Sequence, residues 1–427
     1  MKVLLVGGGG REHALAWKIA QSPLVETIWC APGNPGIAAH AHCVPIQAEA
    51  LDELVAFAIE HQIDLAVIGP EAPLTLGLAD RLRRHDIAVF GPSQGAARLE
   101  GSKAFMKDLL ARHAIPTAAY RTFTEPEPAW EYIQQQGTPI VVKTSGLAAG
   151  KGAIVCQTLE EARQAIDRIM IQREFGSAGD EVVVEGFLKG EEASLLVFVD
   201  GERVLPLAGA QDHKAIWDQD RGPNTGGMGA YSPAPALTEA MVQRAIQTII
   251  LPTVRAMASE GHPYRGILYA GLMIDGEDLQ ILEYNVRFGD PECQPLLMRM
   301  RSDIVPFLLA CAHGSLDGME IDWDPRAALC VVMAAHGYPG SYPKGDVIHG
   351  LDQAATHSDT QVFHAGTRQH QQQIVTAGGR VLGVTALGDG VADAQRRAYA
   401  ALHAITWNGV QFRRDIGYRA VARERDS

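Results

Sequence analysis

The most informative stretch of this chain is Ile281-Leu282-Glu283-Tyr284-Asn285-Val286-Arg287-Phe288-Gly289-Asp290-Pro291-Glu292. Its first half predicts a strand, in which side chains two residues apart point the same way, so Glu283 and Asn285 share a face. A carboxylate and an amide oxygen placed in this way suit Mg²⁺, which also keeps waters and binds substrate phosphates. Arg287 continues on that face and can stabilise charge on a transferring phosphoryl group. The alternative is a solvated strand end that carries a Glu–Arg pair.

The first hundred residues alternate between short apolar strands and amphipathic helices. Their pattern predicts strands at 3–6, 27–30, 64–68 and 87–90, and helices at 11–21, 51–61 and 76–85. Such alternation predicts right-handed crossovers and a parallel sheet with helices on its faces. Ligands of these sheets lie beyond the carboxyl ends of the strands. Three loops are expected there, at 7–10, 32–36 and 69–73.

A run of four glycines, 7–10, lies between the first expected strand and helix. A dinucleotide-binding turn needs Gly-x-Gly-x-x-Gly, but Glu12 occupies the place of the third glycine, which argues against a redox cofactor. Glycines still let backbone amides approach a phosphate at a helix N-terminus. Gly9 and Gly10 are therefore candidate substrate-binding residues, and a tight turn packed on the sheet is the alternative.

A second glycine-rich loop, 146–152, follows Lys143 at the end of an apolar strand. It is not a P-loop, because Gly152 stands where that motif requires Ser or Thr. A flexible loop of this kind can fold over phosphates and exclude water, with Lys143 and Lys103 as phosphate-binding cations. Ser102 is expected to cap the helix that Lys103 begins. The alternative is a mobile hairpin with one exposed lysine.

A third glycine-rich stretch, 222–233, contains too much glycine for a strand or a helix. Its small polar residues and bare backbone suit a sugar phosphate or an amino acid ligand, and the polar segment 211–214 lies just upstream. Loops of this length inside a compact enzyme are usually functional, although a long structural loop is the alternative.

The remaining chain suggests further units. Residues from about 120 to 190 predict a small α+β unit, and residues 191–320 return to longer strands and helices. The segment 322–325 is expected to form a boundary between two of these units. Beyond it, strands expected at 374–376 and 380–387 flank a pair of glycines and predict a hairpin.

Composition narrows the class of protein. A chain of 427 residues is too long for one core and predicts two to four domains. The formal net charge of −13 argues against a general nucleic-acid binder. No apolar stretch approaches the roughly 20 residues of a membrane span, and the N-terminus does not resemble a signal peptide.

The cysteines and histidines do not follow metal-binding patterns. The six cysteines include no Cys-x-x-Cys pair, so we expect free thiols in a reducing, cytoplasmic enzyme. His13, His113, His213 and His336 lack metal-ligand spacing and are expected to be structural.

Together these motifs resemble the ATP-grasp superfamily, and within it the glycinamide ribonucleotide synthetase (phosphoribosylamine–glycine ligase) family, from Lys2 to about Ala422. The most specific match is the stretch from Arg287 to Gln294. The resemblance implies a multidomain α/β and α+β fold. Its parts would be an N-terminal parallel α/β domain (1–102), an ATP-grasp domain (103–325) with a lid subdomain at about 123–190, and a C-terminal mixed α/β domain (326–427).

The resemblance also implies a reaction that belongs to purine biosynthesis. ATP would phosphorylate the carboxylate of glycine, and the amine of 5-phospho-D-ribosylamine would attack the glycyl phosphate. ADP, phosphate and glycinamide ribonucleotide would leave. An acyl phosphate would hydrolyse in water, so a lid must close over it. We expect ATP with Mg²⁺ or Mn²⁺ as cofactors, small-molecule substrates, no nucleic-acid or membrane partner, and a monomer.

The family's functional residues carry over to individual positions of this sequence. The resemblance implies that Lys143, Arg287 and Asp290 are catalytic residues. It also implies that Glu283 and Asn285 bind the metal. The ATP-binding set is Lys103, Lys143, Gly146, Gly150, Lys151, Gly152, Glu185, Leu188 and Glu192, in which Glu185 to Leu188 would meet adenine and Glu192 the ribose. The substrate-binding set is Gly9, Gly10, Asp212, Lys214, Asn224, Thr225, Gly226, Arg287 and Asp290.

Four positions depart from the family's pattern. Ser145 stands where Asp is expected, Ala215 where Arg is expected, Gly186 in place of a second Glu, and Gly8 in place of the usual Asn. Ser145 and Ala215 stand at positions where the resemblance implies lid and substrate contacts. The change at Gly186 has less effect on adenine binding if backbone groups bind the base.

Two other functions stay open. One is another ATP-grasp carboxylate–amine ligase with a different acid or amine. The other is a non-catalytic nucleotide-binding protein, against which the intact set of Lys103, Lys143, Glu283, Asn285 and Arg287 argues.

Overall fold

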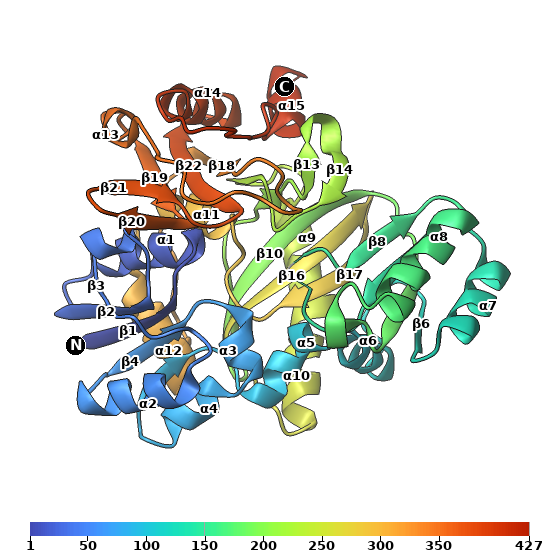
Figure 1. The fold of residues 1–427 in the computed structure, drawn as a ribbon. Helices are drawn as coiled ribbons and strands as arrows, with labels where there is room; N and C mark the ends of the chain where they lie inside the picture. Colours follow the sequence, from blue (N-terminus) through green and yellow to red (C-terminus); the bar gives the residue numbers. More distant parts are fainter. Residues whose placement is uncertain (149, 427) are drawn as a thin grey trace.

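The computed structural model describes residues 1–148 and 150–426. Figure 1 shows the first hundred residues as an α/β unit beside a central sheet, with a small unit on the far side of that sheet and the C-terminal strands above. The mixed α/β multidomain fold predicted from the sequence is confirmed. None of the helices in the described residues is long and apolar enough to cross a membrane.

The N-terminal unit is a parallel sheet in the order β3-β2-β1-β4-β5. Its strands are β1 Lys2–Gly7, β2 Thr27–Pro32, β3 His42–Cys43, β4 Leu65–Ile68 and β5 Ala88–Phe90. Its helices are α1 Gly10–Ile19, α2 Leu51–Glu60, α3 Glu71–Thr75, α4 Leu78–Arg83 and α5 Gln94–Gly101. The apolar residues of β1 are fully buried, because a parallel strand is covered on both faces.

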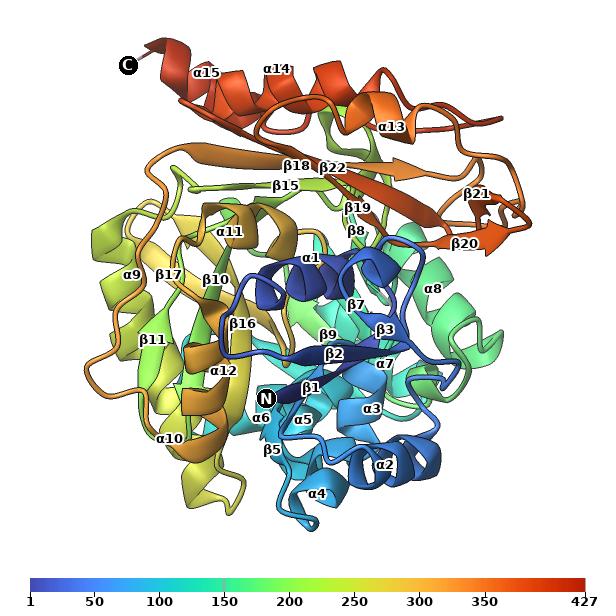
Figure 2. The ribbon, with the colours of Figure 1, turned by 90° about the vertical axis from the view of Figure 1, so that its left-hand side faces the viewer.

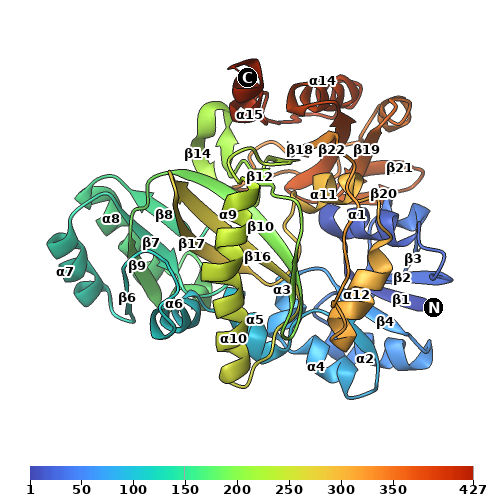
Figure 3. The same ribbon diagram turned by 180° about the vertical axis from the view of Figure 1, so that it is seen from behind.

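The central sheet is antiparallel, in the order β11-β10-β16-β17. Its strands are β10 Glu191–Asp200, β11 Val204–Pro206, β16 Arg265–Asp275 and β17 Asp278–Asn285. The helices that follow or cover it are α9 Glu239–Ala245, α10 Leu251–Ser259, α11 Cys293–Arg299 and α12 Ile304–His313. Figure 3 shows α9 and α10 crossing the rear of this sheet, which leaves its other side to face the ligand site described below.

The small unit, named the lid unit here, is an antiparallel sheet in the order β6-β9-β7-β8. Its elements are β6 Tyr120–Phe123, α7 Pro126–Gln136, β7 Ile140–Thr144, β8 Ala153–Cys156, α8 Leu159–Ile166 and β9 Val182–Gly186. A separate hydrophobic core holds it together. The helix α6 Lys103–Arg112 leads into it, and the side chain of Ser102 accepts a hydrogen bond from the amide of Phe105 at 3.1 Å, which confirms the predicted cap.

The C-terminal sheet is antiparallel, in the order β12-β15-β18-β22-β19. Its strands are β12 Gln211–Asp212, β15 Gly229–Ser232, β18 Ala327–Ala334, β19 Thr360–His364 and β22 Arg380–Gly388. The expectation that the third glycine-rich stretch, 222–233, holds no strand is wrong, because backbone pairing places β14 Arg221–Asn224 at its start and β15 near its end. The strand β14 pairs with β13 Ala215–Trp217, and β15 pairs with β12, both of which lie just upstream. The sheet therefore anchors that stretch against residues that follow it by about a hundred positions.

Helices cover both faces of the C-terminal sheet. The outer ones are α13 Leu351–Ala354, α14 Val391–Leu402 and α15 Tyr418–Asp426. Figure 2 shows α14 and α15 above the sheet, and α1 and α11 side by side below it, with the strands of the N-terminal unit beneath α1. Three sheets thus converge on the segment 286–292, which links β17 to α11 and forms the second half of the stretch from Ile281 to Glu292.

The hairpin predicted from 374–376 and 380–387 is wrong. The strand β21 Gln373–Thr376 pairs with β20 Thr367–His370, whereas β22 pairs with β18 and β19. The glycines between β21 and β22 serve a close approach of two chains instead of a hairpin turn. A Cβ atom on Gly366 would lie 2.5 Å from the Cα of Gly378, and the amide of Ala377 donates to the carbonyl of Gly366 at 2.7 Å.

Candidate active site

A cavity of about 360 Å³ lies where the lid unit, the central sheet, the N-terminal unit and the C-terminal sheet meet. Most of the predicted site residues line it: Lys103, Lys143, Gly150, Gly152, Glu185, Leu188, Glu192, Asp212, Lys214, Asn224, Thr225, Gly226, Glu283, Asn285, Arg287 and Asp290. Gly146, Lys151, Gly9 and Gly10 do not line it. Residues from four separate parts of the sequence are therefore brought to one chamber.

A second cavity lies beside the first, at the carboxyl ends of the parallel strands. Its lining includes Gly7, Gly8 and Gly9, with Pro32 and Pro70 from the two neighbouring loops. All three loops expected at this edge thus contribute to it. The amide of Gly9 donates to the Oε2 atom of Glu12 at 2.6 Å, so the first turn of α1 closes one wall.

Two lysines form the positive end of the first cavity. The ammonium of Lys103 donates to the carbonyl of Gly146 at 3.4 Å, and that of Lys143 to the carbonyl of Leu282 at 3.3 Å. Burial lowers the pKa of Lys103, and the carboxylate of Glu283 opposes this. Two cations fixed in this way can hold the phosphates of a nucleotide.

A buried ion network lies behind Lys143. The carboxylate of Glu185 pairs with both Lys143 and Lys107, and the ammonium of Lys107 donates to the Oγ1 atom of Thr117 at 2.7 Å. Burial alone would raise the pKa of Glu185, but the two lysines hold it below its ordinary value. Lys107 was not predicted as a site residue. Its spacing of four from Lys103 on one helix face was the available signal.

The two predicted metal ligands, Glu283 and Asn285, point into the cavity from the end of β17. The Oε1 atom of Glu283 lies 3.7 Å from the ammonium of Lys214, and the Oδ1 atom of Asn285 accepts from Arg287 at 3.1 Å. Burial would raise the pKa of Glu283, but Lys214, Lys143 and other cations bring it to about 2, so the carboxylate is ionised.

The oxygens of this pair fit a hard divalent cation that is bound only in part by protein. No group of three His, Cys, Asp or Glu side chains that could hold a metal occurs within 1–148 and 150–426. Mg²⁺ commonly takes one or two protein ligands and completes its shell with water and substrate phosphates. The two lysines that would hold those phosphates line the same cavity.

Arg287 is held from the N-terminal unit. Its Nη2 atom donates to the Oε1 atom of Glu100 at 2.8 Å, and its Nε atom to the Oε2 atom of Glu71 at 3.1 Å. Burial raises the pKa of Glu100 to about 7, against the pull of Arg287. Burial would also raise the pKa of Glu71, but Arg287 and Arg11 bring it to about 2. Glu71 lies in the expected loop 69–73 and Glu100 lies just before the expected helix cap Ser102, although neither carboxylate was given a role.

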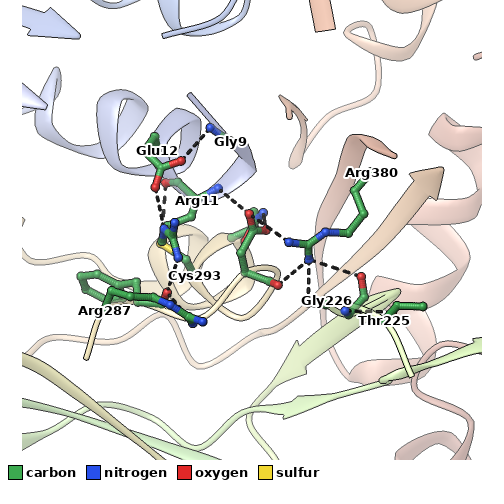
Figure 4. Close-up of polar contacts among 12 residues, drawn as sticks. Gly9, Arg11, Glu12, Thr225, Gly226, Arg287, Cys293 and Arg380 are labelled. Carbon is green, nitrogen blue, oxygen red and sulfur yellow. Dashed lines mark hydrogen bonds and ion pairs between the residues drawn. The ribbon is translucent and has the colours of Figure 1, made fainter. Parts of the chain in front are cut away.

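Asp290 joins all three sides of the site. Its Oδ1 atom accepts from Gln294 at 2.8 Å and its Oδ2 atom from the amide of Arg11 at 3.4 Å. Its carbonyl accepts from the Nη1 atom of Arg380 at 2.6 Å, and that same nitrogen donates to the carbonyl of Gly226 at 2.7 Å. Figure 4 shows Arg380 reaching from the C-terminal strands to Gly226, opposite Arg11. The sequence reading missed Arg380, because no motif surrounds it.

The substrate end of the cavity contains several carboxylates around one lysine. The ammonium of Lys214 pairs with the Oε2 atom of Glu192 at 2.7 Å, and the hydroxyl of Thr225 donates to the carbonyl of Lys214 at 2.8 Å. Burial raises the pKa of Asp212 to about 8, against the attraction of Lys214. Glu192, expected at the nucleotide ribose, is engaged by Lys214 in this structure.

The tip of the loop between β7 and β8 leans on the C-terminal sheet. The ammonium of Lys151 donates to the carbonyl of Pro339 at 2.6 Å. Gly150 has a φ of +77°, and a Cβ atom there would lie 2.8 Å from the carbonyl oxygen of Thr225. A Cβ atom on Gly146 would meet Ala178 of the lid unit. The described residues of the loop therefore contact the C-terminal unit through Lys151 and the third glycine-rich stretch at Gly150.

The structure accounts for some departures from the family's pattern. The hydroxyl of Ser145 accepts from the amide of Ala104 at 3.2 Å, so it helps to cap α6, as an aspartate could. A Cβ atom on Gly8 would lie 2.6 Å from the carbonyl oxygen of Gly33, which this loop path does not allow. At Gly186 the space is open, with the nearest atom 3.8 Å away. Ala215 is buried and its carbonyl accepts from Arg413 at 3.2 Å.

Two of the four histidines expected to be structural make buried backbone contacts, and the cysteines are free thiols. His13 accepts at Nδ1 from the amide of His364 at 2.7 Å, and the Nε2 atom of His213 accepts from the amide of Gly417 at 2.7 Å. Both rings are buried and hold chain segments together. Within the part of the chain that the structure describes, all six cysteines are free thiols.

Comparison with protein families gives three adjoining matches. Residues 1–100 match the N domain of phosphoribosylglycinamide synthetase, residues 101–293 its ATP-grasp (A) domain, and residues 328–419 its C domain. A curated protein from Vibrio parahaemolyticus, phosphoribosylamine–glycine ligase, is 57% identical over 100% of both chains. The ligase of the same name from Escherichia coli O157:H7 is 56% identical, again over 100% of both chains.

Solved structures agree with these matches. The crystal structure of phosphoribosylamine–glycine ligase from Thermotoga maritima is 32% identical, with a TM-score of 0.85 over 97% of this chain and 100% of that one. A biotin carboxylase from Campylobacter jejuni has a TM-score of 0.73 at 15% identity, over 96% of this chain and 92% of that one. The second likeness concerns the fold alone.

Proposed function

This chain belongs to the phosphoribosylglycinamide synthetase family, and we propose that it joins glycine to 5-phospho-D-ribosylamine with the cleavage of ATP to ADP and phosphate. The product is glycinamide ribonucleotide, an intermediate of purine biosynthesis. The observation that carries this proposal is one cavity that holds Lys103, Lys143, Glu283, Asn285 and Arg287 between the lid unit and the segment after β17.

The first step is a phosphoryl transfer. A carboxylate oxygen of glycine attacks the γ-phosphorus of ATP, the bond to the bridging oxygen breaks, and ADP leaves. Lys103 and Lys143 hold the phosphates from the lid side, and Arg287 faces the oxygens on which charge builds. Glu71 and Glu100 keep Arg287 in place during this step.

The second step is an acyl transfer. The amine of phosphoribosylamine attacks the carbonyl carbon of glycyl phosphate, inorganic phosphate leaves, and the nitrogen loses a proton. The loop at 146–152 excludes water, which would otherwise hydrolyse the acyl phosphate. Asp290, fixed by Arg11 and Arg380 at the junction of the two cavities, orients the reacting groups.

Glu283 and Asn285 would hold Mg²⁺ or Mn²⁺, which would neutralise charge on the nucleotide phosphates when bound. Lys214 lies close enough to Glu283 to compete for the carboxylate, so the ion pair of 3.7 Å would loosen as the site is loaded. Asn285 would likewise exchange its contact with Arg287 for the cation.

The assignment of the remaining site residues is part of the same proposal. It includes the nucleotide set from Lys103 to Glu192 and the substrate set from Gly9 to Asp290 named above. We also propose domains at 1–102, 103–325 and 326–427, a monomeric state and a cytoplasmic location, the last consistent with the free thiols of the described residues.

The test is ADP release with each component omitted in turn. Turnover should require ATP, a divalent cation, glycine and freshly prepared phosphoribosylamine together. Alanine and glycylglycine serve as alternative acids, and ammonia as an alternative amine. Faster turnover with alanine or the dipeptide than with glycine would overturn the substrate assignment and leave an ATP-grasp ligase of other specificity. Nucleotide binding without any ADP release would favour a non-catalytic protein.

A further inference from the structure

We propose that Arg380 is a substrate-binding residue, which the C-terminal sheet places at the junction of the two cavities to hold an anionic substrate oxygen. The inference rests on the proposed function, which brings two such anions to this place. One is the carboxylate of glycine, with the acyl phosphate it becomes, and the other is the phosphate of phosphoribosylamine.

The guanidinium of Arg380 is only partly used by the protein. Its Nη1 atom makes the short contacts to the carbonyls of Asp290 and Gly226, at 2.6 and 2.7 Å, and a longer one to Gly227 at 3.4 Å. Its Nη2 atom lies 3.7 Å from the Oδ2 atom of Asp290, beyond hydrogen-bond distance. Within residues 1–148 and 150–426, neither Nη2 nor Nε donates a hydrogen bond. A guanidinium carries five N–H groups, so three remain for a ligand.

The position of Arg380 gives those donors access to a ligand. Arg380, Arg11, Asp290 and Pro70 are common to the linings of both cavities, so they form the junction. The side chain of Arg380 is 23% exposed, although it is fastened on one side by Nη1. A planar fork with free edges matches the paired oxygens of a carboxylate or a phosphate.

A second cation at the junction favours the same class of ligand. Arg11 donates from Nε to Glu12 at 2.6 Å and from Nη1 to the carbonyl of Phe288 at 3.0 Å. Its Nη2 atom makes no hydrogen bond to any described residue. Asp290 bonds to the amide of Arg11 and to the Nη1 atom of Arg380, and Figure 4 shows the two arginines on opposite sides of the site. An anion bound beside Asp290 at this junction would meet donors from the first and the last domain of the chain.

Two roles of Arg380 can be separated by substitution. The carbonyls of Gly226 and Asp290 are held by a single nitrogen, which the ammonium of a lysine can replace. The planar edge formed by Nε and Nη2 has no counterpart in lysine. Arg380→Lys therefore removes the ligand contact and keeps a cation for the structural one, whereas Arg380→Gln removes both. Arg368→Gln, on the exposed strand β20, is the matched control.

The experiment measures KM for glycine, KM for phosphoribosylamine, the Kd of ribose 5-phosphate, the Kd of ATP and the melting temperature. Arg380→Lys should raise the constant of one anionic substrate on the order of 10- to 100-fold, as for a lost hydrogen bond to a charged group. The Kd of ATP and the melting temperature should stay close to those of the wild type and of Arg368→Gln.

The separate constants for glycine and for phosphoribosylamine show which of the two substrates supplies the anionic oxygen that Arg380 binds. A higher KM for glycine alone assigns Arg380 to the carboxylate or acyl phosphate. A higher KM for phosphoribosylamine, with a higher Kd for ribose 5-phosphate, assigns it to the sugar phosphate. Unchanged constants in Arg380→Lys, or losses that extend equally to ATP, would overturn the proposal and leave a structural tie. Because ribose 5-phosphate binding needs no turnover, that arm can be read even if the wild type released no ADP with glycine.

Discussion

The ammonium of Lys151, at the tip of the loop between β7 and β8, donates a hydrogen bond of 2.6 Å to the carbonyl of Pro339. This contact ties the lid unit to the loop that follows β18 in the C-terminal unit. Tyr338, the neighbour of Pro339, accepts at its hydroxyl from the amide of Gly226 at 3.1 Å. The lid loop and the third glycine-rich stretch therefore contact adjacent residues of one C-terminal segment.

The substitution Gly150→Ala tests this closure. A Cβ atom at Gly150 would lie 2.8 Å from the carbonyl oxygen of Thr225, so the loop should no longer seat on the third glycine-rich stretch. We expect ADP release coupled to ligation to fall by about tenfold or more, because a misplaced closing loop loses positioning. The share of ATP hydrolysed without ligation should rise. The fall in turnover is measured as the rate of glycinamide ribonucleotide formation. The uncoupled share of hydrolysis is measured as the ratio of ADP to glycinamide ribonucleotide.

The control for this change is Gly137→Ala. Gly137 has a φ of +78°, nearly that of Gly150, but no atom lies within 4 Å of its Cβ position. Both variants thus place a side chain at a positive φ, which strains the backbone, and only Gly150→Ala also carries the clash. Equal activity in the two variants would show that Gly150 is needed for its φ alone and that the contact with Thr225 is dispensable.

Lys107→Met tests the buried network behind the phosphate lysines. Lys107 is fully buried and pairs with Glu185, so its loss leaves that carboxylate with Lys143 alone. Removing one partner of a buried ion pair typically costs about 3–5 kcal/mol in the free energy of unfolding. Lys143 should also be drawn toward Glu185, which raises KM for ATP.

Denaturant unfolding and nucleotide titration measure both effects of Lys107→Met. The exposed Lys344 provides the control, as Lys344→Met. A variant that keeps wild-type stability would show that Lys107 contributes no net ion-pair energy. A normal KM for ATP in a destabilised variant would show that the ion network stabilises the fold but does not affect nucleotide binding.

Acid should weaken the contact between α1 and β19. Burial lowers the pKa of His13 well below 6.5, and burial lowers the pKa of His364 to about 4. The folded state therefore binds fewer protons than the unfolded chain between pH 6.5 and about 4. The stabilisation is complete above pH 6.5 and is lost as pH falls. Each histidine contributes a slope of up to about 1.4 kcal/mol per pH unit.

His13→Asn isolates one of these titrations, because an amide oxygen can accept from the backbone of His364 as Nδ1 does. The free energy of unfolding, measured from pH 7.5 to pH 5, should fall less steeply in this variant than in the wild type. His85→Asn, on an exposed turn, should keep the wild-type slope. Identical slopes in all three proteins would show that His13 titrates normally in the folded state.

Local patterns explain why so much of this structure could be read from the sequence. The two-residue period of β17 places Glu283 and Asn285 on one face, and the strand–helix alternation fixes the parallel sheet of the N-terminal unit. The cap at Ser102 could also be predicted, because capping depends on residues that are only three apart in the sequence. Each of these inferences needs only neighbours in sequence.

The role of Arg380 and the pairing of β21 could not be predicted from local patterns, because both depend on segments that lie far apart in the sequence. Arg380 acts through carbonyls of Gly226 and Asp290, which any residue could supply. The glycines near β21 look like a turn, yet they permit a close approach to Gly366. Lys107 is intermediate, since its spacing from Lys103 was visible but its partner Glu185 lies on another strand.

The final prediction concerns Glu283→Gln. Glu283 is ionised, with a pKa held at about 2 against burial by Lys214, Lys143 and other cations. The substitution keeps the size and one oxygen but removes the charge that a divalent cation would need. Turnover should fall on the order of 100-fold or more, as for the loss of a preorganised electrostatic partner. It should recover in part at high Mg²⁺ or with Mn²⁺, which a loss of folding alone would not do.

Glu277→Gln is the matched control for Glu283→Gln, because Glu277 lies in the turn before β17 with its side chain 92% exposed. The same loss of charge there should leave turnover and its dependence on Mg²⁺ unchanged. ADP release is measured over a Mg²⁺ series for both variants and the wild type, beside thermal melting. If Glu283→Gln turned over normally at limiting Mg²⁺, Glu283 would not be a metal ligand. Its carboxylate would then serve only to balance Lys214, from which it lies 3.7 Å away.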